Sequence, residues 1–306
     1  MLRQAYHSFR DLISVLIASS LLLALVGYAT DQAVGLFEIS VGAVVVLMLS
    51  FYLLFGSGSV FFDVVFSNAI TIYLCFFAFF VESLFSDVDQ IFLSVGFILP
   101  LAAFLLGASL RRHQIKEIVT SGLVDSDADF ARSFLWLLPI AAIGVAAFVV
   151  HQGTSFSRDD LNYIFLGEMG LIGFVVFLAS KDFALLLVDT GIIFSNLFSK
   201  NVNLIKPAFA FFTFYSMNIV IFAAIYRIVD HLSAIQNFIV RGTPRDLTFV
   251  ESLYFSLVTI STLGYGDILP VTNAIRFIVG VQSFFGTMLF FFGVHAILTH
   301  KKSQEF

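Results

Sequence analysis

Long apolar stretches separated by short polar segments follow one another along almost the whole chain. A helix that crosses a bilayer needs about 20 apolar residues. Six candidate stretches lie in the first 180 residues, at Asp11–Ala29, Ala33–Phe55, Phe61–Leu84, Ile91–Leu110, Phe134–His151 and Leu161–Ser180. Two more follow residue 200, at Pro207–Ile228 and Val271–Leu298. The pattern predicts an all-α polytopic membrane protein with eight transmembrane helices. The first stretch is interpreted as a retained helix, not a signal peptide, because the second follows almost at once.

Composition supports this fold class and excludes several functions. Of the 306 residues, 59% are hydrophobic and 12% are charged, and the mean hydropathy is +0.98, far from the balance of a soluble domain. The histidines and the single cysteine have no metal-binding or catalytic spacing, and the sequence contains no basic patch or phosphate-binding glycine loop. We therefore expect no enzymatic activity, no cofactor and no nucleic-acid partner.

The segment between the last two apolar stretches has a different pattern. Phe249 to Ser261 is amphipathic and too short to cross a bilayer, and Thr248 and Glu251 have the spacing of a capping box. A Thr-Leu-Gly-Tyr-Gly-Asp sequence follows directly at 262–267. Glycine permits backbone conformations that bring successive carbonyls into line, and rings of carbonyls can replace the water shell of a potassium ion. The short helix would direct its negative C-terminal end toward such an ion.

This sequence resembles the selectivity filter of the pore-loop potassium channel superfamily, in which valine usually stands where this chain has Leu263. The resemblance covers about the last third of the chain. It implies a filter that binds K⁺, made of Thr262, Leu263, Gly264, Tyr265 and Gly266, with K⁺ held at the first four. Asp267 and Glu251 are expected to support it. Because one loop supplies a quarter of a filter, the resemblance implies a homotetramer, in which each chain has three identical subunits as partners.

The last apolar stretch is expected to line the pore below the filter. In the superfamily a glycine about five helical turns beyond the filter lets this inner helix bend, and Gly286 has that spacing. The same helix face carries Ser283, Thr287, Phe290 and Val294. The resemblance directs this face toward the pore axis, where four Phe290 rings could form a hydrophobic gate. The alternative is that Phe290 packs against the outer helix, because an error of one residue rotates the face by about 100°.

The positions of the basic residues predict the orientation. In the superfamily both ends of the pore module are cytoplasmic, and threading six spans backward from there places most basic loops on that same side. They contain Arg3, Arg10, Arg111, Arg112, Lys116, Arg132, Lys181, Lys200, Lys206, Lys301 and Lys302. The acidic residues Glu82, Asp87 and Asp89 fall on the opposite side. This positive-inside distribution predicts a multi-pass protein of the cell membrane with both termini cytoplasmic.

The chain is predicted to have three parts: a peripheral six-span membrane domain at 1–180, an amphipathic connecting helix at 181–200 and a pore module at 201–306. Asp182, Asp189 and Asn196 recur every seven residues, which places them on one face of a helix. We interpret this helix as lying along the cytoplasmic membrane surface. An extension of the sixth span or a buried hairpin would have the same periodicity.

Two carboxylates lie inside predicted spans, Glu38 in the second and Glu168 in the sixth. Ionisable groups in a membrane are costly and usually face a partner or water. One interpretation is a site that senses protons or a ligand and acts on the pore. The other is a structural carboxylate that pairs with Arg227, a hydroxyl or water.

The function that the sequence predicts is passive, potassium-selective conduction through a tetrameric pore surrounded by membrane lipid. No span has basic residues at every third position, so steep voltage gating is not expected. Two alternatives are a potassium transporter subunit and a membrane receptor or sensor with a non-conducting pore-like module.

Overall fold

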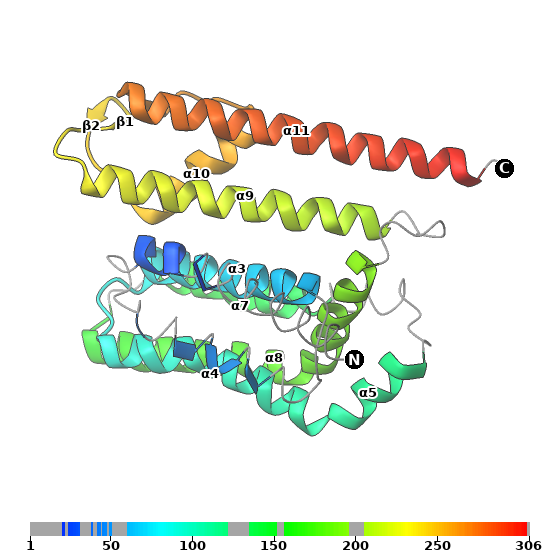
Figure 1. Cartoon of the computed structure of the whole chain (residues 1–306). Coiled ribbons are helices and arrows are strands. Elements are labelled where there is room, and N and C mark those ends of the chain that lie inside the picture. The colour runs from blue at the N-terminus through cyan, green and yellow to red at the C-terminus, as the bar shows by residue number, and fades with distance from the viewer. Residues whose placement is uncertain are drawn as a thin grey trace, which may run out of the picture.

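Two groups of helices lie side by side, one made of α3, α4, α7 and α8 and the other of α9, α10 and α11 (Figure 1). The computed structural model describes residues 60–121, 135–151, 156–195 and 205–304, with short helical stretches between residues 20 and 50. The helices are α3 (Val60–Leu84), α4 (Gln90–Leu110), α5 (Arg112–Ser121), α7 (Leu137–His151), α8 (Arg158–Ser195), α9 (Ile205–Leu232), α10 (Phe249–Ile260) and α11 (Asn273–Gln304). Three short strands are β1 (Phe238–Val240), β2 (Thr243–Pro244) and β3 (Ile268–Pro270).

The described helices agree with the predicted membrane spans where both can be compared. Five are long and apolar enough to cross a bilayer, within α3, α4, α8, α9 and α11. The predicted fifth span corresponds to α7, a shorter apolar helix of 15 residues. The first two predicted spans lie largely outside the described residues. The chain is therefore a mostly helical, multi-pass membrane protein, and the number of eight spans stays a prediction.

Close contacts at glycines join α4 to α8. A Cβ atom on Gly96 would collide with the ring of Phe165, and one on Gly107 would collide with Ser180. Residue numbers rise together along both helices, so α4 and α8 run parallel. This direction agrees with the threading predicted from the sequence, in which α7 follows α4 and precedes α8 and crosses the membrane in the opposite direction to both. Small residues permit the helices of membrane proteins to approach closely.

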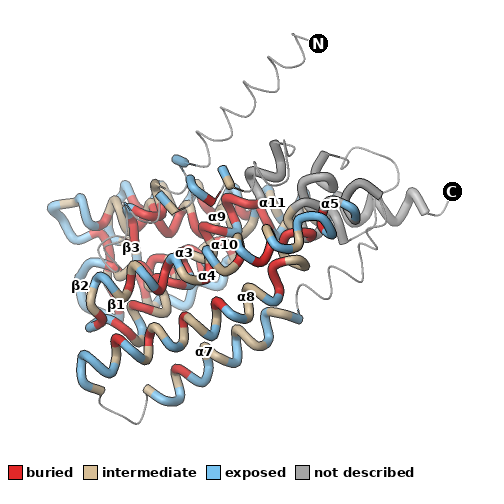
Figure 2. Tube along the Cα trace, turned by 90° about the horizontal axis from the view of Figure 1, so that it is seen from below, coloured by how far each residue is buried: buried red, intermediate tan, exposed pale blue. Residues whose placement is uncertain are grey.

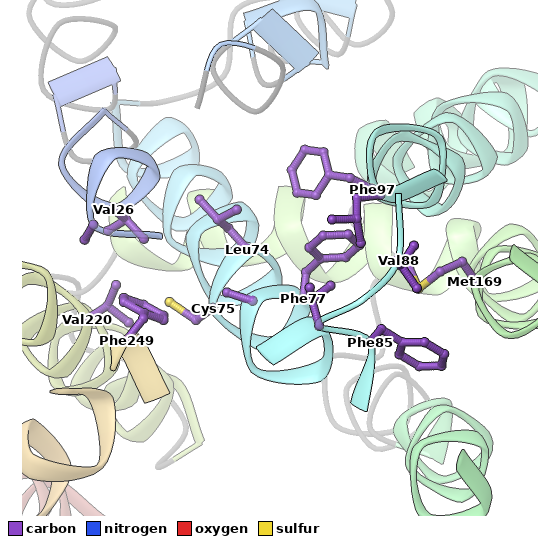
Figure 3. Close-up of a cluster of buried hydrophobic side chains, with 14 of the residues drawn as sticks. Val26, Leu74, Cys75, Phe77, Phe85, Val88, Phe97, Met169, Val220 and Phe249 are labelled. Atoms are coloured by element: carbon purple, nitrogen blue, oxygen red, sulfur yellow. The ribbon is translucent and has the colours of Figure 1, made fainter. Parts of the chain in front are cut away.

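The two groups of helices share one apolar core. Figure 3 shows Val220 of α9 and Phe249 of α10 beside Cys75 of α3. The same cluster continues through Phe77 to Phe97 of α4. Buried positions are concentrated where the two groups meet, whereas α7 is mostly half-buried or exposed (Figure 2). The pore helix α10 therefore packs directly against α3 of the other group.

The structure corrects the predicted boundary at residue 181. Helix α8 continues through Lys181 to Ser195 as one 38-residue helix, so this part of the segment extends the sixth span instead of forming a separate surface helix. Trp136 Nε1 donates a hydrogen bond of 2.8 Å to Asp182 Oδ2, which places this carboxylate against protein. The side chain of Asp189 and the whole of Asn196 lie outside the described residues. The predicted polar face thus has one described member.

A small sheet adds to the predicted all-helical fold. Strands pair antiparallel in the order β2-β1-β3, with Val240 opposite both Thr243 and Ile268. The sequence analysis placed the start of the inner helix directly after Pro270, but Pro270 ends β3 and α11 begins at Asn273. The sheet joins the segment after α9 to the segment that follows the Thr-Leu-Gly-Tyr-Gly sequence.

Candidate functional site

The short helix α10 begins as the sequence predicts. Thr248 Oγ1 accepts a hydrogen bond from Glu251 N at 3.2 Å, and Glu251 Oε2 accepts one from Thr248 N at 3.0 Å, which completes a capping box. Glu251 also forms an ion pair with Arg245, with one N–O distance of 2.8 Å. The hydrogen bond from Arg245 holds the pKa of the Glu251 carboxyl below its usual value. Glu251, predicted to support the filter, therefore braces the opposite end of α10.

The segment after α10 has an alternating backbone. The φ angles are +57° at Thr262, +58° at Gly264 and +82° at Gly266, whereas Leu263 and Tyr265 are not in the positive region. Alternation of left- and right-handed residues turns successive N–H groups to one side of the chain, and so successive carbonyls to the other. Glycine adopts positive φ at little cost, but a β-branched residue such as Thr262 does so only under strain. The described backbone is thus suited to present a row of carbonyl oxygens.

The first residues of this segment are tied to the end of α10. Thr262 N donates to Thr259 O and Leu263 N donates to Val258 O, both at 3.1 Å. The Thr262 hydroxyl donates to Ser261 O at 2.7 Å, which leaves its oxygen lone pairs available to a cation. These bonds fix the start of the segment at the negative end of the helix dipole, where a cation is stabilised.

The outer end of the segment is held from two directions. Tyr254 of α10 donates its hydroxyl proton to Asp267 Oδ2 at 2.8 Å, and Arg241 N donates to Asp267 O at 2.8 Å. Strand β3 follows at once and pairs with β1. Asp267 was predicted from the sequence, but its partner Tyr254 and the strand pairing were not. The turn at Arg241-Gly242, flanked by apolar and β-branched residues, was the available signal for this hairpin.

A buried polar network lies behind the segment and joins three helices. Gln282 of α11 accepts a 2.7 Å hydrogen bond from the Tyr226 hydroxyl of α9 and donates one of 2.7 Å to Ser256 Oγ of α10. Ser256 in turn donates to Ile219 O at 2.7 Å. The side chains of Gln282, Ser256 and Tyr226 are fully buried. Sequence reasoning missed this network, although a glutamine inside an apolar inner helix was a signal for it.

Helix α11 packs Gly286 and Gly293 against neighbouring helices and leaves its phenylalanines exposed. A Cβ on Gly286 would lie 2.7 Å from Ile260 Cγ1, and one on Gly293 would lie 2.9 Å from the ring of Phe211. Gly286 therefore sits at a close approach to α10, and its role as a hinge on the pore-lining face stays a prediction. The residues grouped with it divide as follows: Ser283 is half-buried, whereas Thr287, Phe290 and Val294 are exposed.

The two carboxylates differ in their surroundings. Glu38 lies in a short described helical stretch with its side chain exposed. Glu168 is half-buried, and its Oε2 is buried without a hydrogen-bond partner. Arg227, which was considered as its partner, donates to Leu247 O at 2.6 Å. The pairing of Glu168 with Arg227 stays a prediction.

Comparison with known proteins covers only the region around this segment. Residues 209–299 match the model of a family described as ion channel. A stretch of 64 residues is 37% identical to two-pore potassium channel 4 of Arabidopsis thaliana, and it covers 21% of this chain and 22% of that relative. No solved structure matches the chain. Together with the outer helix, short helix and inner helix described above, these matches place residues 209–299 in the pore-loop ion channel superfamily.

Proposed function

We propose that this chain is one subunit of a potassium-selective channel through which K⁺ moves passively. The observation that carries the proposal is the alternating backbone of Thr262 to Gly266 at the C-terminal end of α10. A row of carbonyls can exchange with the water shell of K⁺ at this position. In this proposal K⁺ binds at Thr262, Leu263, Gly264 and Tyr265, with Gly266 at the outer end of the filter. K⁺ is the permeant ligand, and the proposal needs no cofactor.

The proposed pore is a homotetramer with one filter loop from each chain. Support comes from the exposure of the filter in a single chain, where Leu263 is 57% and Tyr265 is 66% exposed. Large apolar side chains also stand exposed along α11, among them Phe277, Phe284, Phe285, Phe290, Phe291 and Phe292. Three further identical subunits would cover part of this surface, and membrane lipid would cover the rest.

The exposed part of α11 also supports a proposal for the gate. Phe290 is 60% exposed, and Thr287 and Val294, which lie near it on the helix, are also exposed. Four such rings around an axis would narrow the path below the filter and close it by dewetting. Phe290 is therefore the proposed gate. We also propose that the channel lies in the plasma membrane and that both chain ends are cytoplasmic.

Reconstituted flux tests the proposal. Protein in liposomes should release K⁺ down its gradient without an energy source, Na⁺ should not replace it, and external Ba²⁺ should block it. Flux that requires a coupled ion gradient would favour a transporter subunit. Absence of K⁺ flux from liposomes that contain folded tetramer would favour a sensor with a non-conducting module.

A further inference from the structure

A carboxylate of the peripheral domain binds the first turn of the pore helix α10. Glu82, in the last turn of α3, accepts a hydrogen bond of 3.1 Å from Val250 N through its Oε2. Val250 is the second residue of α10, and amides at this position have no partner within their own helix. A carboxylate there also interacts favourably with the positive end of the helix dipole. The start of the pore helix is thus capped from outside the pore module.

An apolar contact holds the same turn from the same helix. Phe249, the first residue of α10, is 1% exposed and belongs to the core cluster that contains Cys75, Phe77 and Val81 of α3 (Figure 3). The last turns of α3 therefore hold the first turn of α10 by a charge-assisted hydrogen bond and by a buried aromatic ring. These two contacts are independent of each other.

Helix α10 connects this contact directly to the filter. It has 12 residues, and the amides of Thr262 and Leu263 are bonded to carbonyls in its last turn. A short, fully hydrogen-bonded helix moves as a unit, so a displacement of its start by α3 also displaces Thr262. Thr262 has a strained positive φ, which persists only while the surrounding structure holds it. The filter is thus sensitive to the position of α3.

Building on the proposed channel function, we propose that Glu82 is a positioning residue through which the peripheral domain sets the open probability of the filter. Movement of α3 relative to the pore module changes the Glu82–Val250 contact and with it the equilibrium between conducting and non-conducting filters. Glu82 touches neither the permeating ion nor the filter. The capping box of Thr248 and Glu251 keeps α10 helical when Glu82 is absent, so the loss of Glu82 changes the position of the helix more than its folding.

Single-channel recording from reconstituted protein tests this role with three variants. Glu82→Ala removes the acceptor and the charge, Glu82→Gln keeps an acceptor oxygen without the charge, and Asp87→Asn removes an equal charge from the exposed loop after α3. A hydrogen bond to a charged group is worth enough to change an equilibrium by roughly tenfold or more. We expect open probability to fall by about that factor in Glu82→Ala, by less in Glu82→Gln and not at all in Asp87→Asn. Unitary conductance and K⁺ over Na⁺ selectivity should be unchanged in all three.

Hydrogen exchange in the protein provides a second readout that does not depend on conduction. The peptide that contains Val250 should exchange faster in Glu82→Ala than in Asp87→Asn. If Glu82→Ala does not assemble, Glu82→Gln decides the question. Wild-type open probability in the Glu82 variants would overturn the inference while leaving the channel proposal intact, and so would a change confined to unitary conductance. A wild-type protein that conducts no K⁺ would overturn both.

Discussion

The pore module and the peripheral domain are held together by different kinds of contact. In the pore module, α9, α10 and α11 converge on a buried network centred on Gln282, in which each described polar group has a partner. In the peripheral domain, α4 and α8 approach closely at three glycines, with ring and aliphatic contacts at Gly96 and Gly173, and hydrogen bonds from Arg111 to α8 lie only near Gly107. Hydrogen bonds have directional requirements, whereas apolar contacts at glycine have few.

We relate this difference to the proposed filter, which lies in the pore module and not in the peripheral domain. The filter backbone contains a strained threonine and two glycines at positive φ, and it needs fixed anchors at both ends and from behind. The contacts at Gly96 and Gly173 are mainly with side-chain carbons, which impose no hydrogen-bond geometry on the two parallel helices. We therefore expect filter geometry to depend on single polar atoms in the pore module, and the peripheral domain to depend on packing volume.

The largest effect is expected in the filter itself. Gly264→Ala or Gly266→Ala places a side chain at positive φ, which costs roughly 1–2 kcal/mol per residue and roughly 4–8 kcal/mol for a ring of four. K⁺ flux or its preference over Na⁺ should be lost while the protein remains in the membrane. Gly280→Ala is the matched control, since Gly280 is helical and nothing lies within 4 Å of its added Cβ. Unchanged selectivity in both filter variants would mean that this loop is not the filter.

The second effect concerns the network behind the filter. Gln282→Leu removes the acceptor of the Tyr226 hydroxyl and the donor to Ser256, which keeps its own bond to Ile219 O, and each unsatisfied buried group costs about 1–3 kcal/mol. Thermal unfolding in detergent should show a loss of about 3 kcal/mol. The exposed Gln236→Leu provides the control for the same chemical change. Equal stability of the two variants would contradict the assignment of this network.

The third effect tests the packing of the peripheral domain. Gly107→Ala forces a methyl group against Ser180 and the Phe177 carbonyl, and overpacking of this kind costs about 1–3 kcal/mol. The melting temperature should fall, but K⁺ over Na⁺ selectivity should be that of the wild type. Gly144→Ala, where nothing lies within 4 Å, should leave both unchanged. A change of selectivity in Gly107→Ala would show that the two regions are not separable in this way.

The fourth effect concerns the proposed gate. Phe290→Ser removes an exposed ring from α11. Resting K⁺ conductance should rise about tenfold, which corresponds to about 1.4 kcal/mol in the gating equilibrium. Phe291→Ser and Phe292→Ser, on other faces of the helix, are the comparisons. An increase in one of these variants and not in Phe290→Ser would assign the gate to another face.

The smallest effect is a pH dependence at the start of α10. Arg245 lowers the pKa of Glu251 in the folded protein, so the ion pair stabilises the fold at pH above the usual glutamate value of about 4.3. This contribution is lost as the pH falls below 4.3 through the lowered folded value, and it amounts to about 1 kcal/mol or less. The melting temperature should therefore fall more between pH 6 and pH 3 in the wild type than in Glu251→Gln. Identical pH profiles would exclude the pair as a source of stability.

The sequence predicted the elements that are determined by residues close to one another along the chain. Hydropathy placed α3, α4, α9 and α11 within a few residues, and the capping box located the start of α10, because both signals depend on neighbouring residues. Thr262 to Gly266 were identified as a candidate filter from a short run of adjacent residues, and their role as a filter stays a proposal. The continuation of α8 past Lys181 was not predicted, since a polar residue every seven positions fits a surface helix and a span extension equally.

Contacts between distant elements could not be predicted. The bonds of Tyr254 to Asp267 and of Gln282 to Ser256 depend on the rotation of α10 and α11 about their own axes, which periodicity leaves undetermined. The same uncertainty explains Gly286, whose close contact with Ile260 requires the relative position of α10 and α11. The Glu82–Val250 contact joins residues 168 positions apart and has no signature in the sequence of either helix.

The reversal potential of reconstituted channels, with K⁺ on one side of a bilayer and Na⁺ on the other, tests the central claim most directly. If backbone carbonyls at Thr262 to Tyr265 form a K⁺ filter, the reversal potential should be displaced strongly from zero toward the equilibrium potential of K⁺. The displacement should disappear in Gly264→Ala and persist in Gly107→Ala. A wild-type reversal potential near zero, or an equal displacement in Gly264→Ala, would contradict the account.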